Sequence, residues 1–159
     1  MLTITIPPKE YFIEETQNFL YSPEKQIKLE HSLVSISKWE AHWKKPFLSD
    51  EDKTTEEFIH YVKCMTITQN VEDLVYYSLT KENMLAITDY INESRTATTV
   101  YEPPENGRSK QIITSELIYY WMSSLNIPFE CQKWHLSRLL MYIKVTNAKQ
   151  NPIVTGKQL

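Results

Sequence analysis

Two apolar stripes between residues 111 and 146 constrain the fold of this chain more than any other feature of its sequence. In the first half, five apolar residues recur at helical spacing, so one face of a helix must be covered: Leu117, Ile118, Trp121, Met122 and Leu125. Thr114 and Ser115 offer N-cap oxygens just before this helix. Asn126 and Pro128 interrupt it, because proline removes a backbone donor and disfavours the helical region for the residue before it.

A second helix is predicted to begin near Phe129. Its apolar residues repeat at i, i+3, i+4 and i+7, at Leu136, Leu139, Leu140 and Ile143. A helical hairpin is the simplest arrangement in which the two stripes bury each other. The periodicity ends near Thr146, and residues 149–159 are predicted to form a flexible tail.

The N-terminal part of the chain has the period-two pattern of strands. Leu2, Ile4 and Ile6 alternate with threonines until two prolines end the pattern. Alternation returns over residues 18–31 around Ser22-Pro23, which predicts a β-hairpin with its turn there. A helix beginning at Ser22 is the alternative left open. Residues 94–101 are rich in β-branched side chains and are interpreted as a strand that pairs with the N-terminal one.

Helices are predicted between these β segments. Residues 32–43 place apolar side chains on one helical side, and Pro46 stops the helix. Thr54 to Glu57 has the pattern of a capping box, and two more helices are expected after Asn70 and Thr80. Residues 103–107 are interpreted as a surface loop. The predicted fold is α+β and mainly α: a single-domain helical bundle over residues 1–148, with the C-terminal helical hairpin and a small N-terminal β element.

Composition excludes several classes of function. Only two glycines occur, so the chain has no glycine-rich loop to cradle phosphate, and no nucleotide cofactor is expected. Residues 1–110 carry 12 Lys/Arg against 18 Asp/Glu, whereas residues 111–159 carry five against two, or −6 and +3. A charge of +3 falls short of a nucleic-acid-binding stripe. No apolar run approaches the roughly 18 residues of a membrane span and no signal peptide is visible, so a cytoplasmic protein is expected.

No metal or cofactor site is predicted from the ionisable residues. The four histidines are scattered, and the two cysteines, Cys64 and Cys131, are interpreted as buried thiols. Cys131 and His135 are four positions apart, which would place both on one side of a helix, and Ser137 is a second candidate nucleophile beside this histidine. No third group or glycine turn accompanies the pair, so it is not expected to be catalytic.

The tryptophans have two interpretations that the sequence leaves open. They are either core residues or, with the neighbouring basic residues, a partner-binding patch. The candidate partner-binding residues are Trp39, Trp43, Trp121, Trp134, His135 and Arg138. Arg138 lies within the apolar stripe of the second helix and is the candidate for a buried ion pair or an interface anchor.

Three segments together resemble a family of small bacteriophage proteins, the tail assembly chaperones of long-tailed phages. They are LEHSLVSISKWEAHWKKPF at 29–47, KCMTITQNVEDLVYYSL at 63–79, and ITSELIYYWMSSLNIPFECQKWHLSRLLMYIKV at 113–145. The most recognisable marks are the Trp-x-x-x-Trp pattern and the segment Trp134-His135-Leu136. Members of the family continue into a longer basic tail, whereas this sequence ends at NPIVTGKQL, so the resemblance carries no expectation for a function of such a tail.

The resemblance implies a non-enzymatic protein of the host cytoplasm. Such a protein binds the phage tape-measure protein, or other tail proteins, and keeps it soluble until tail-tube subunits polymerise around it. The runner-up is a structural virion subunit, such as a head–tail connector or tail-completion protein. A small hydrolase using Cys131 and His135 is the third hypothesis. A homo-oligomer is left open, and neither nucleic acid nor membrane is an expected partner.

Overall fold

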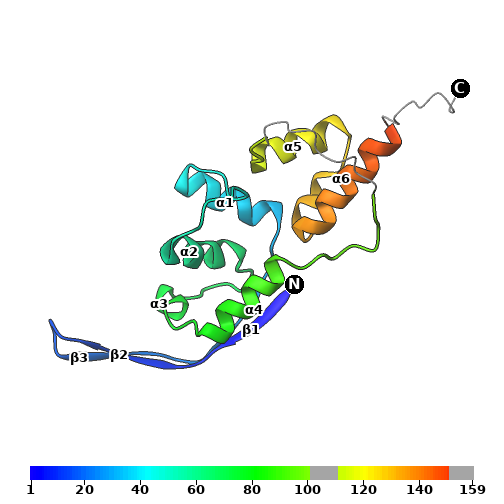
Figure 1. Ribbon diagram of the computed structural model, residues 1–159. Coiled ribbons are helices and arrows are strands. Elements are labelled where there is room, and N and C mark those ends of the chain that lie inside the picture. The colour runs from blue at the N-terminus through cyan, green and yellow to red at the C-terminus, as the bar shows by residue number, and fades with distance from the viewer. Residues whose placement is uncertain (101–110, 151–159) are drawn as a thin grey trace, which may run out of the picture. The chain divides into compact units, whose positions relative to one another are not determined.

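The computed structural model describes residues 1–100 and 111–150. These residues form an α+β fold with six α-helices, one 3-10 helix and two antiparallel two-stranded sheets (Figure 1). The predicted loop at 103–107 and residues 151–159 of the predicted tail lie outside the described residues.

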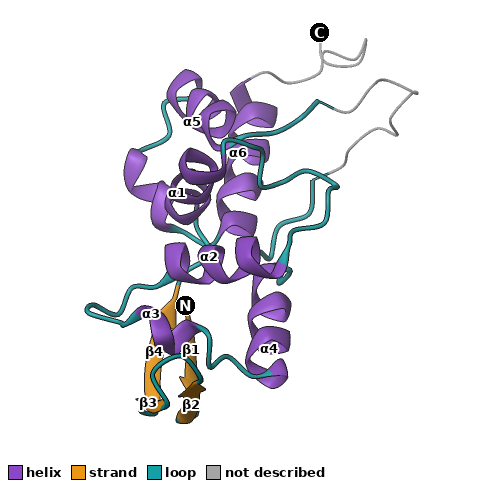
Figure 2. Cartoon of the chain, turned by 90° about the vertical axis from the view of Figure 1, so that its left-hand side faces the viewer, coloured by secondary structure: helices purple, strands orange, loops and turns teal. Residues whose placement is uncertain are grey.

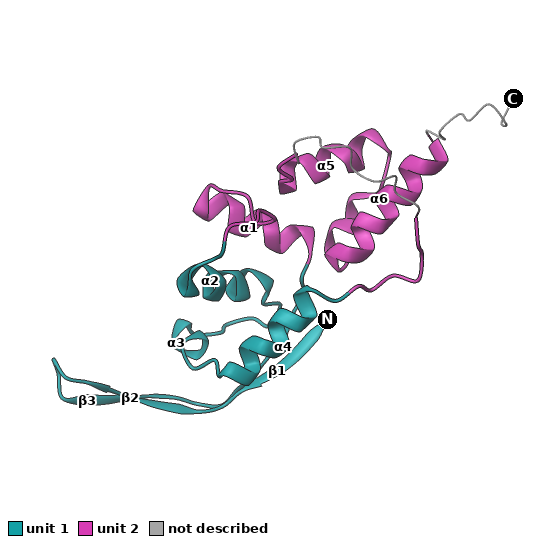
Figure 3. Ribbon diagram, viewed as in Figure 1, with its two compact units in different colours: residues 1–31, 52–93 teal, residues 32–51, 94–159 magenta. Residues whose placement is uncertain are grey.

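The chain divides into two compact units, and each is discontinuous in sequence (Figure 3). Unit 1 contains residues 1–31 and 52–93, and unit 2 contains residues 32–51 and 94–159. All four strands, orange in Figure 2, belong to unit 1. That residues 1–148 form a single domain stays a prediction.

The central sheet of unit 1 pairs β1 (Leu2–Ile6) with β4 (Lys25–Leu29). The strands are antiparallel, with Leu2 opposite Leu29 and Ile6 opposite Lys25. Four residues of this sheet are buried, namely Ile4, Ile6, Ile27 and Leu29. Their period-two spacing puts them on one face, which explains why the N-terminal strand was correctly predicted.

The second sheet pairs β2 (Lys9–Ile13) with β3 (Asn18–Ser22). The predicted hairpin turn at Ser22-Pro23 is therefore wrong, because β3 and β4 both exist but pair with different strands. The tight turn lies instead between β2 and β3, where Gln17 has a φ of 52°. Ser22-Pro23 is the point at which the chain passes from one sheet to the other, and the alternative of a helix beginning there is also excluded.

Three helices complete unit 1: α2 (Thr55–Met65), α3 (Asp73–Tyr76) and α4 (Lys81–Ile91). The predicted capping box is confirmed, because Thr54 accepts from the Glu57 N–H while Glu57 accepts from the Thr54 N–H. Thr80 caps α4 in the same way, but Glu72, not Asn70, precedes α3. The side chain of Asn83 on α4 donates to the Thr5 carbonyl of β1 at 3.1 Å, which fastens this helix to the sheet.

Unit 2 contains α1 (Leu33–Trp43), α5 (Ser115–Ser124), the 3-10 helix η1 (Phe129–Lys133) and α6 (Leu136–Gln150). Ser32 and Thr114 cap α1 and α5, and the latter cap confirms the prediction. The prediction of a continuous second helix from Phe129 is wrong, because the chain breaks at Trp134-His135 before α6. α6 also continues four residues beyond Thr146.

The predicted strand at 94–101 is also wrong. Residues 94–100 have no regular secondary structure, and Tyr101 lies outside the described residues. β-Branched residues fit a pleated sheet only where a neighbouring strand is available. The described part of this segment has a different anchor, because the Arg95 N–H donates to the Ser137 hydroxyl at 3.0 Å.

A carboxylate joins the distant parts of unit 2. Glu40 on α1 accepts from the backbone N–H of Ser115 at 2.8 Å and from the Ser115 hydroxyl, both at Oε1. Its Oε2 accepts from the Phe47 N–H at 2.9 Å. The same side chain therefore holds the turn after α1 and the first turn of α5, where a helix N-terminus also favours negative charge.

Candidate functional site

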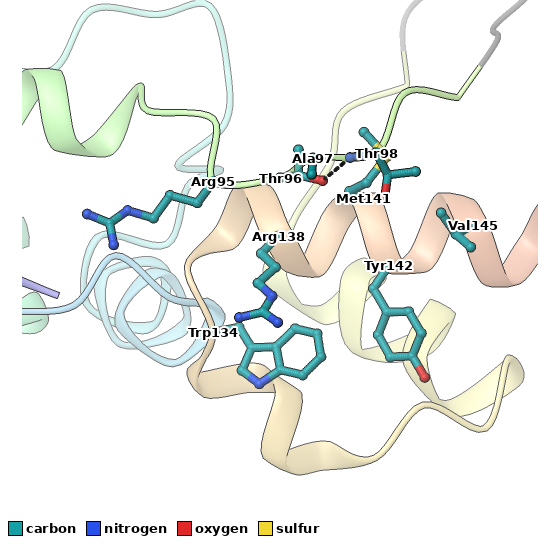
Figure 4. A pocket seen from close by; sticks show the side chains of 9 residues that line it. All are labelled: Arg95, Thr96, Ala97, Thr98, Trp134, Arg138, Met141, Tyr142 and Val145. Atoms are coloured by element: carbon teal, nitrogen blue, oxygen red, sulfur yellow. Dashed lines mark hydrogen bonds between the residues drawn. The ribbon is translucent and has the colours of Figure 1, made fainter.

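α6 contributes to two pockets of unit 2, and the first is here named the arginine–tryptophan pocket (Figure 4). It has a volume of about 430 Å³. One wall is the extended segment 95–98, and the other is α6 with the residue pair that precedes it. Its lining residues are Arg95, Thr96, Ala97, Thr98, Trp134, Arg138, Met141, Tyr142 and Val145.

Three side chains in this pocket form one stack. The Trp134 ring lies against the Tyr142 ring with centroids 5.5 Å apart and an interplanar angle of 27°. The guanidinium carbon of Arg138 lies 4.8 Å from the centroid of the Trp134 ring, within the range of a cation–π interaction. Residues at i and i+4 share a helical face, which brings Arg138 and Tyr142 together on α6.

Two arginines are among the residues of this pocket. Arg95 and Arg138 both line it, and no Asp or Glu is among its described lining residues. Arg138 is exposed, which excludes the alternative of a buried ion pair, and its alternative role as an interface anchor stays a prediction. The pocket therefore offers aromatic surface beside a cationic group that the tryptophan ring holds in place.

His135 lies directly before α6 and is almost fully buried. Its Nδ1 accepts from the Ser137 backbone N–H at 3.2 Å and lies 2.8 Å from the Ser137 hydroxyl, with which it forms a second hydrogen bond. The same hydroxyl accepts from the Arg95 N–H. The predicted Ser137–His135 pair does meet, but both groups act as a cap for α6 and an anchor for segment 95–98.

Cys131 and His135 do not lie on one helix, contrary to the prediction. Cys131 is buried in η1, whereas His135 follows the end of that helix. Burial, together with the nearby Glu130 carboxylate, raises the pKa of the Cys131 thiol above its usual value, against smaller opposing effects of a backbone hydrogen bond and Arg138. The thiol is thus protonated at neutral pH, and only the thiolate is a strong nucleophile.

The second pocket of unit 2 is here named the apolar pocket. It has a volume of about 690 Å³ and lies between residues of α5 and α6. Most of its wall is apolar, and Lys144 and two side-chain amides are the main polar contributors. Its lining residues are Ile113, Trp121, Ser124, Leu125, Leu140, Ile143, Lys144, Asn147 and Gln150.

The structure separates the six predicted partner-binding residues. Trp134 and Arg138 line the arginine–tryptophan pocket, and Trp121 lines the apolar pocket. Trp39 is 1% exposed and packs edge-on against Phe47, with ring centroids 5.2 Å apart. Of the two interpretations that the sequence left open for the tryptophans, Trp39 therefore fits that of a core residue. His135 is 5% exposed and Trp43 is half-buried beside Trp39.

Sequence reasoning missed an aromatic surface on the β2–β3 sheet of unit 1. Phe12, Phe19 and Tyr21 are all more than half exposed, and the Phe12 and Phe19 rings lie 5.0 Å apart. Phe12 is directly opposite Phe19, and Tyr21 is opposite Glu10 on the same face. The signal that could have revealed it is the run of Tyr11, Phe12 and Ile13 shortly before the alternating residues 18–21, a run that the prediction left unassigned.

The buried polar groups of unit 1 form a separate cluster. His31 Nδ1 lies 2.6 Å from the Tyr61 hydroxyl, and the Tyr90 hydroxyl donates to Glu30 at 3.0 Å while accepting from the His31 N–H. The cluster joins the end of β4 to α2 and α4. These partners are internal to the unit, so the cluster is a structural one.

Neither a metal site nor a membrane span is found in the part of the chain that the structure describes. Within residues 1–100 and 111–150, no group of three His, Cys, Asp or Glu side chains is placed to hold a metal ion. Among the same residues, no helix combines the length and apolar character needed to cross a bilayer. Comparison of the chain with protein-family models, with curated proteins and with solved structures gave no match.

Proposed function

We propose that this protein binds another polypeptide, and that it is a phage tail assembly chaperone of the host cytoplasm whose client is the tape-measure protein. The observation that carries the proposal is the apolar pocket between α5 and α6. The resemblance of residues 29–47, 63–79 and 113–145 to tail assembly chaperones supports the same conclusion.

The position of the apolar pocket between residues of α5 and α6 suits a helical client. An amphipathic helix inserts apolar residues at i, i+3 or i+4, and i+7 into a groove between two helices. Its volume of about 690 Å³ is within the usual range for binding pockets. We infer that α5 and α6 serve here as a helical hairpin within a helical bundle, with the pocket in the seam.

The surroundings of the pocket favour reversible binding. A long helical client that exposes apolar stripes aggregates unless they are covered. Trp121 is the largest aromatic residue of the pocket and is half-buried, so part of its ring remains available to a client. Several such weak contacts keep the client soluble and still allow the tube protein to displace the chaperone.

The test is client binding by the full chain and two matched variants. Trp121→Ala removes the aromatic anchor, and we expect it to weaken binding of the tape-measure protein by roughly 30-fold, as for a typical interface hot spot. Tyr120→Ala is the control, because Tyr120 is exposed on the same helix and does not line the pocket. Titration calorimetry gives the affinity, and a thermal melt establishes that both variants fold. Equal affinity of the folded Trp121→Ala variant and the control would contradict the proposal.

A structural virion subunit, such as a head–tail connector or tail-completion protein, is the second candidate. The exposed aromatic face of the β2–β3 sheet favours it, because permanent subunits use such surfaces to assemble. A mass-spectrometric inventory of purified virions separates the two functions. Presence in stoichiometric amounts would replace the chaperone by the subunit, whereas absence from the particle supports the chaperone.

A further inference from the structure

We propose that the protein self-associates, and that the β2–β3 hairpin of one copy docks in the arginine–tryptophan pocket of a second copy. This interaction goes beyond the proposed function, because it uses neither the apolar pocket nor a client. It joins a surface of unit 1 to a pocket of unit 2 in a different molecule.

The hairpin has the exposure of an arm that needs a binding partner. Within residues 1–100 and 111–150, β2 and β3 pair with each other and with no other strand, and an isolated two-stranded hairpin is at best marginally stable in water. Its base is fixed to unit 1 by the hydrogen bond between the hydroxyls of Tyr11 and Ser78, 2.8 Å apart. Beyond this point Phe12 is 54% exposed and Phe19 64% exposed. Figure 1 shows β2 and β3 extending away from the helices of their own unit.

The exposed aromatic area of the hairpin can form the centre of a specific contact. Each aromatic side chain can bury roughly 150–250 Å² when fully exposed beforehand. Phe12, Phe19 and Tyr21 are 54%, 64% and 65% exposed, so together they offer on the order of 270–460 Å². A standard protein interface buries about 800 Å² on each partner, so these rings supply about a third to a half of one side.

Charge selects the occupant of the pocket. Residues 9–22 contain one lysine and three glutamates, Glu10, Glu14 and Glu15, for a net charge of −2. Arg95 and Arg138 are among the described residues that line the pocket, no acidic residue is among them, and the Arg138 guanidinium lies over the Trp134 ring (Figure 4). Hairpin-to-hairpin pairing would instead bring six glutamates together, which is unfavourable. An acidic, aromatic arm thus meets a basic, aromatic pocket, and complementary potentials of this kind determine which surfaces pair.

The proposed contact is heterologous, since the two copies use different surfaces. Such contacts close into reciprocal dimers or rings, or they extend as filaments. The test is analytical ultracentrifugation of the full chain over a concentration series at low and high salt. We expect reversible association that salt weakens, because exposed charges are screened.

Charge-reversal variants identify the surfaces. Arg138→Glu and the double variant Glu14→Lys/Glu15→Lys are each expected to raise the dissociation constant at least about tenfold. Mixing the two variants is expected to restore association, because the reversed hairpin meets the reversed pocket and the two unchanged surfaces also meet. Lys149→Glu is the control, since Lys149 is exposed on α6 outside the pocket, and it is expected to associate like the original protein.

Several results would overturn the proposal. A chain that stays monomeric at every soluble concentration has no such contact. Association that persists in both reversal variants uses another interface, and a mixture that fails to associate excludes the pairing of these two surfaces. Circular dichroism melts of every variant establish that each is folded, so that loss of association reports on the contact. Client binding by the apolar pocket is measured separately and can hold or fail independently.

Discussion

Removal of the Glu40 carboxylate is expected to destabilise unit 2 strongly. Its two oxygens accept three hydrogen bonds, two from Ser115 and one from the Phe47 N–H. Hydrogen bonds to a charged group contribute about 1.5–3 kcal/mol each in buried sites, but Glu40 is partly exposed and solvent weakens them. At about 1 kcal/mol for each bond, Glu40→Ala is expected to lower the free energy of unfolding by about 3 kcal/mol. Glu40→Gln keeps one good acceptor, and about half of that loss is expected.

Urea unfolding followed by tryptophan fluorescence measures this loss directly. All four tryptophans belong to unit 2, so the signal reports on the unit that contains Glu40. Lys38→Ala is the matched control, because Lys38 is exposed on the same helix and a change of less than about 0.5 kcal/mol is expected there. If Glu40→Ala destabilised the unit no more than Lys38→Ala, the reasoning that this carboxylate joins α1 to α5 would be refuted.

Three further predictions concern single side chains. Cys64 is half-buried, whereas Cys131 is buried and its burial raises the pKa of its thiol. Iodoacetamide should therefore alkylate Cys64 before Cys131, which mass spectrometry can follow, and the opposite order would contradict this. Burial raises the pKa of Tyr76 in the folded chain, so the unfolded chain loses that proton first and stability falls as pH rises above about 10. Tyr76→Phe should flatten this alkaline decline, measured by urea unfolding against Tyr77→Phe, and an unchanged decline would refute the assignment. Ser137→Ala removes two hydrogen bonds before α6 and should cost about 1–2 kcal/mol in the same fluorescence assay, whereas no loss would mean that the cap is dispensable.

Features that depend on neighbouring residues were predicted correctly, whereas the pairing of strands that are distant in the sequence was not. The capping box from Thr54 to Glu57 was predicted because both partners lie within one helical turn. β1 and β4 were each recognised as strands, yet their pairing depends on an intervening hairpin of which only β3 was predicted. Pro23 is compatible with a turn and equally with a connection between sheets, since it has no N–H to donate in either case. The choice between them is made by tertiary structure.

Part of the candidate site was also predicted from local spacing in the sequence. Trp134 and Arg138 were both predicted as partner-binding residues, and both line one pocket. They are four positions apart, and their side chains lie on the same side although Trp134 precedes the first residue of α6. The buried position of Trp39 was not separable from a surface position by periodicity, since an amphipathic stripe can face either a core or a partner. The role of His135 as a cap was also invisible, because histidine is not a usual N-cap residue. Arg95 was missed because its segment looked like a strand.

Deletion of the β2–β3 hairpin is expected to separate folding from association. Ile6 and Lys25 are opposite one another in the antiparallel pair of β1 and β4, so a two-residue Asn-Gly turn can replace residues 7–24. The shortened chain keeps the buried sheet residues and the contact of α4 with β1. It loses the Tyr11–Ser78 hydrogen bond, which costs about 1 kcal/mol. Far-ultraviolet circular dichroism is expected to show a cooperative melt close to that of the full chain, while ultracentrifugation shows a monomer. An unfolded product would mean that the hairpin is required for the core of unit 1, and its exposed aromatic face would then need another explanation.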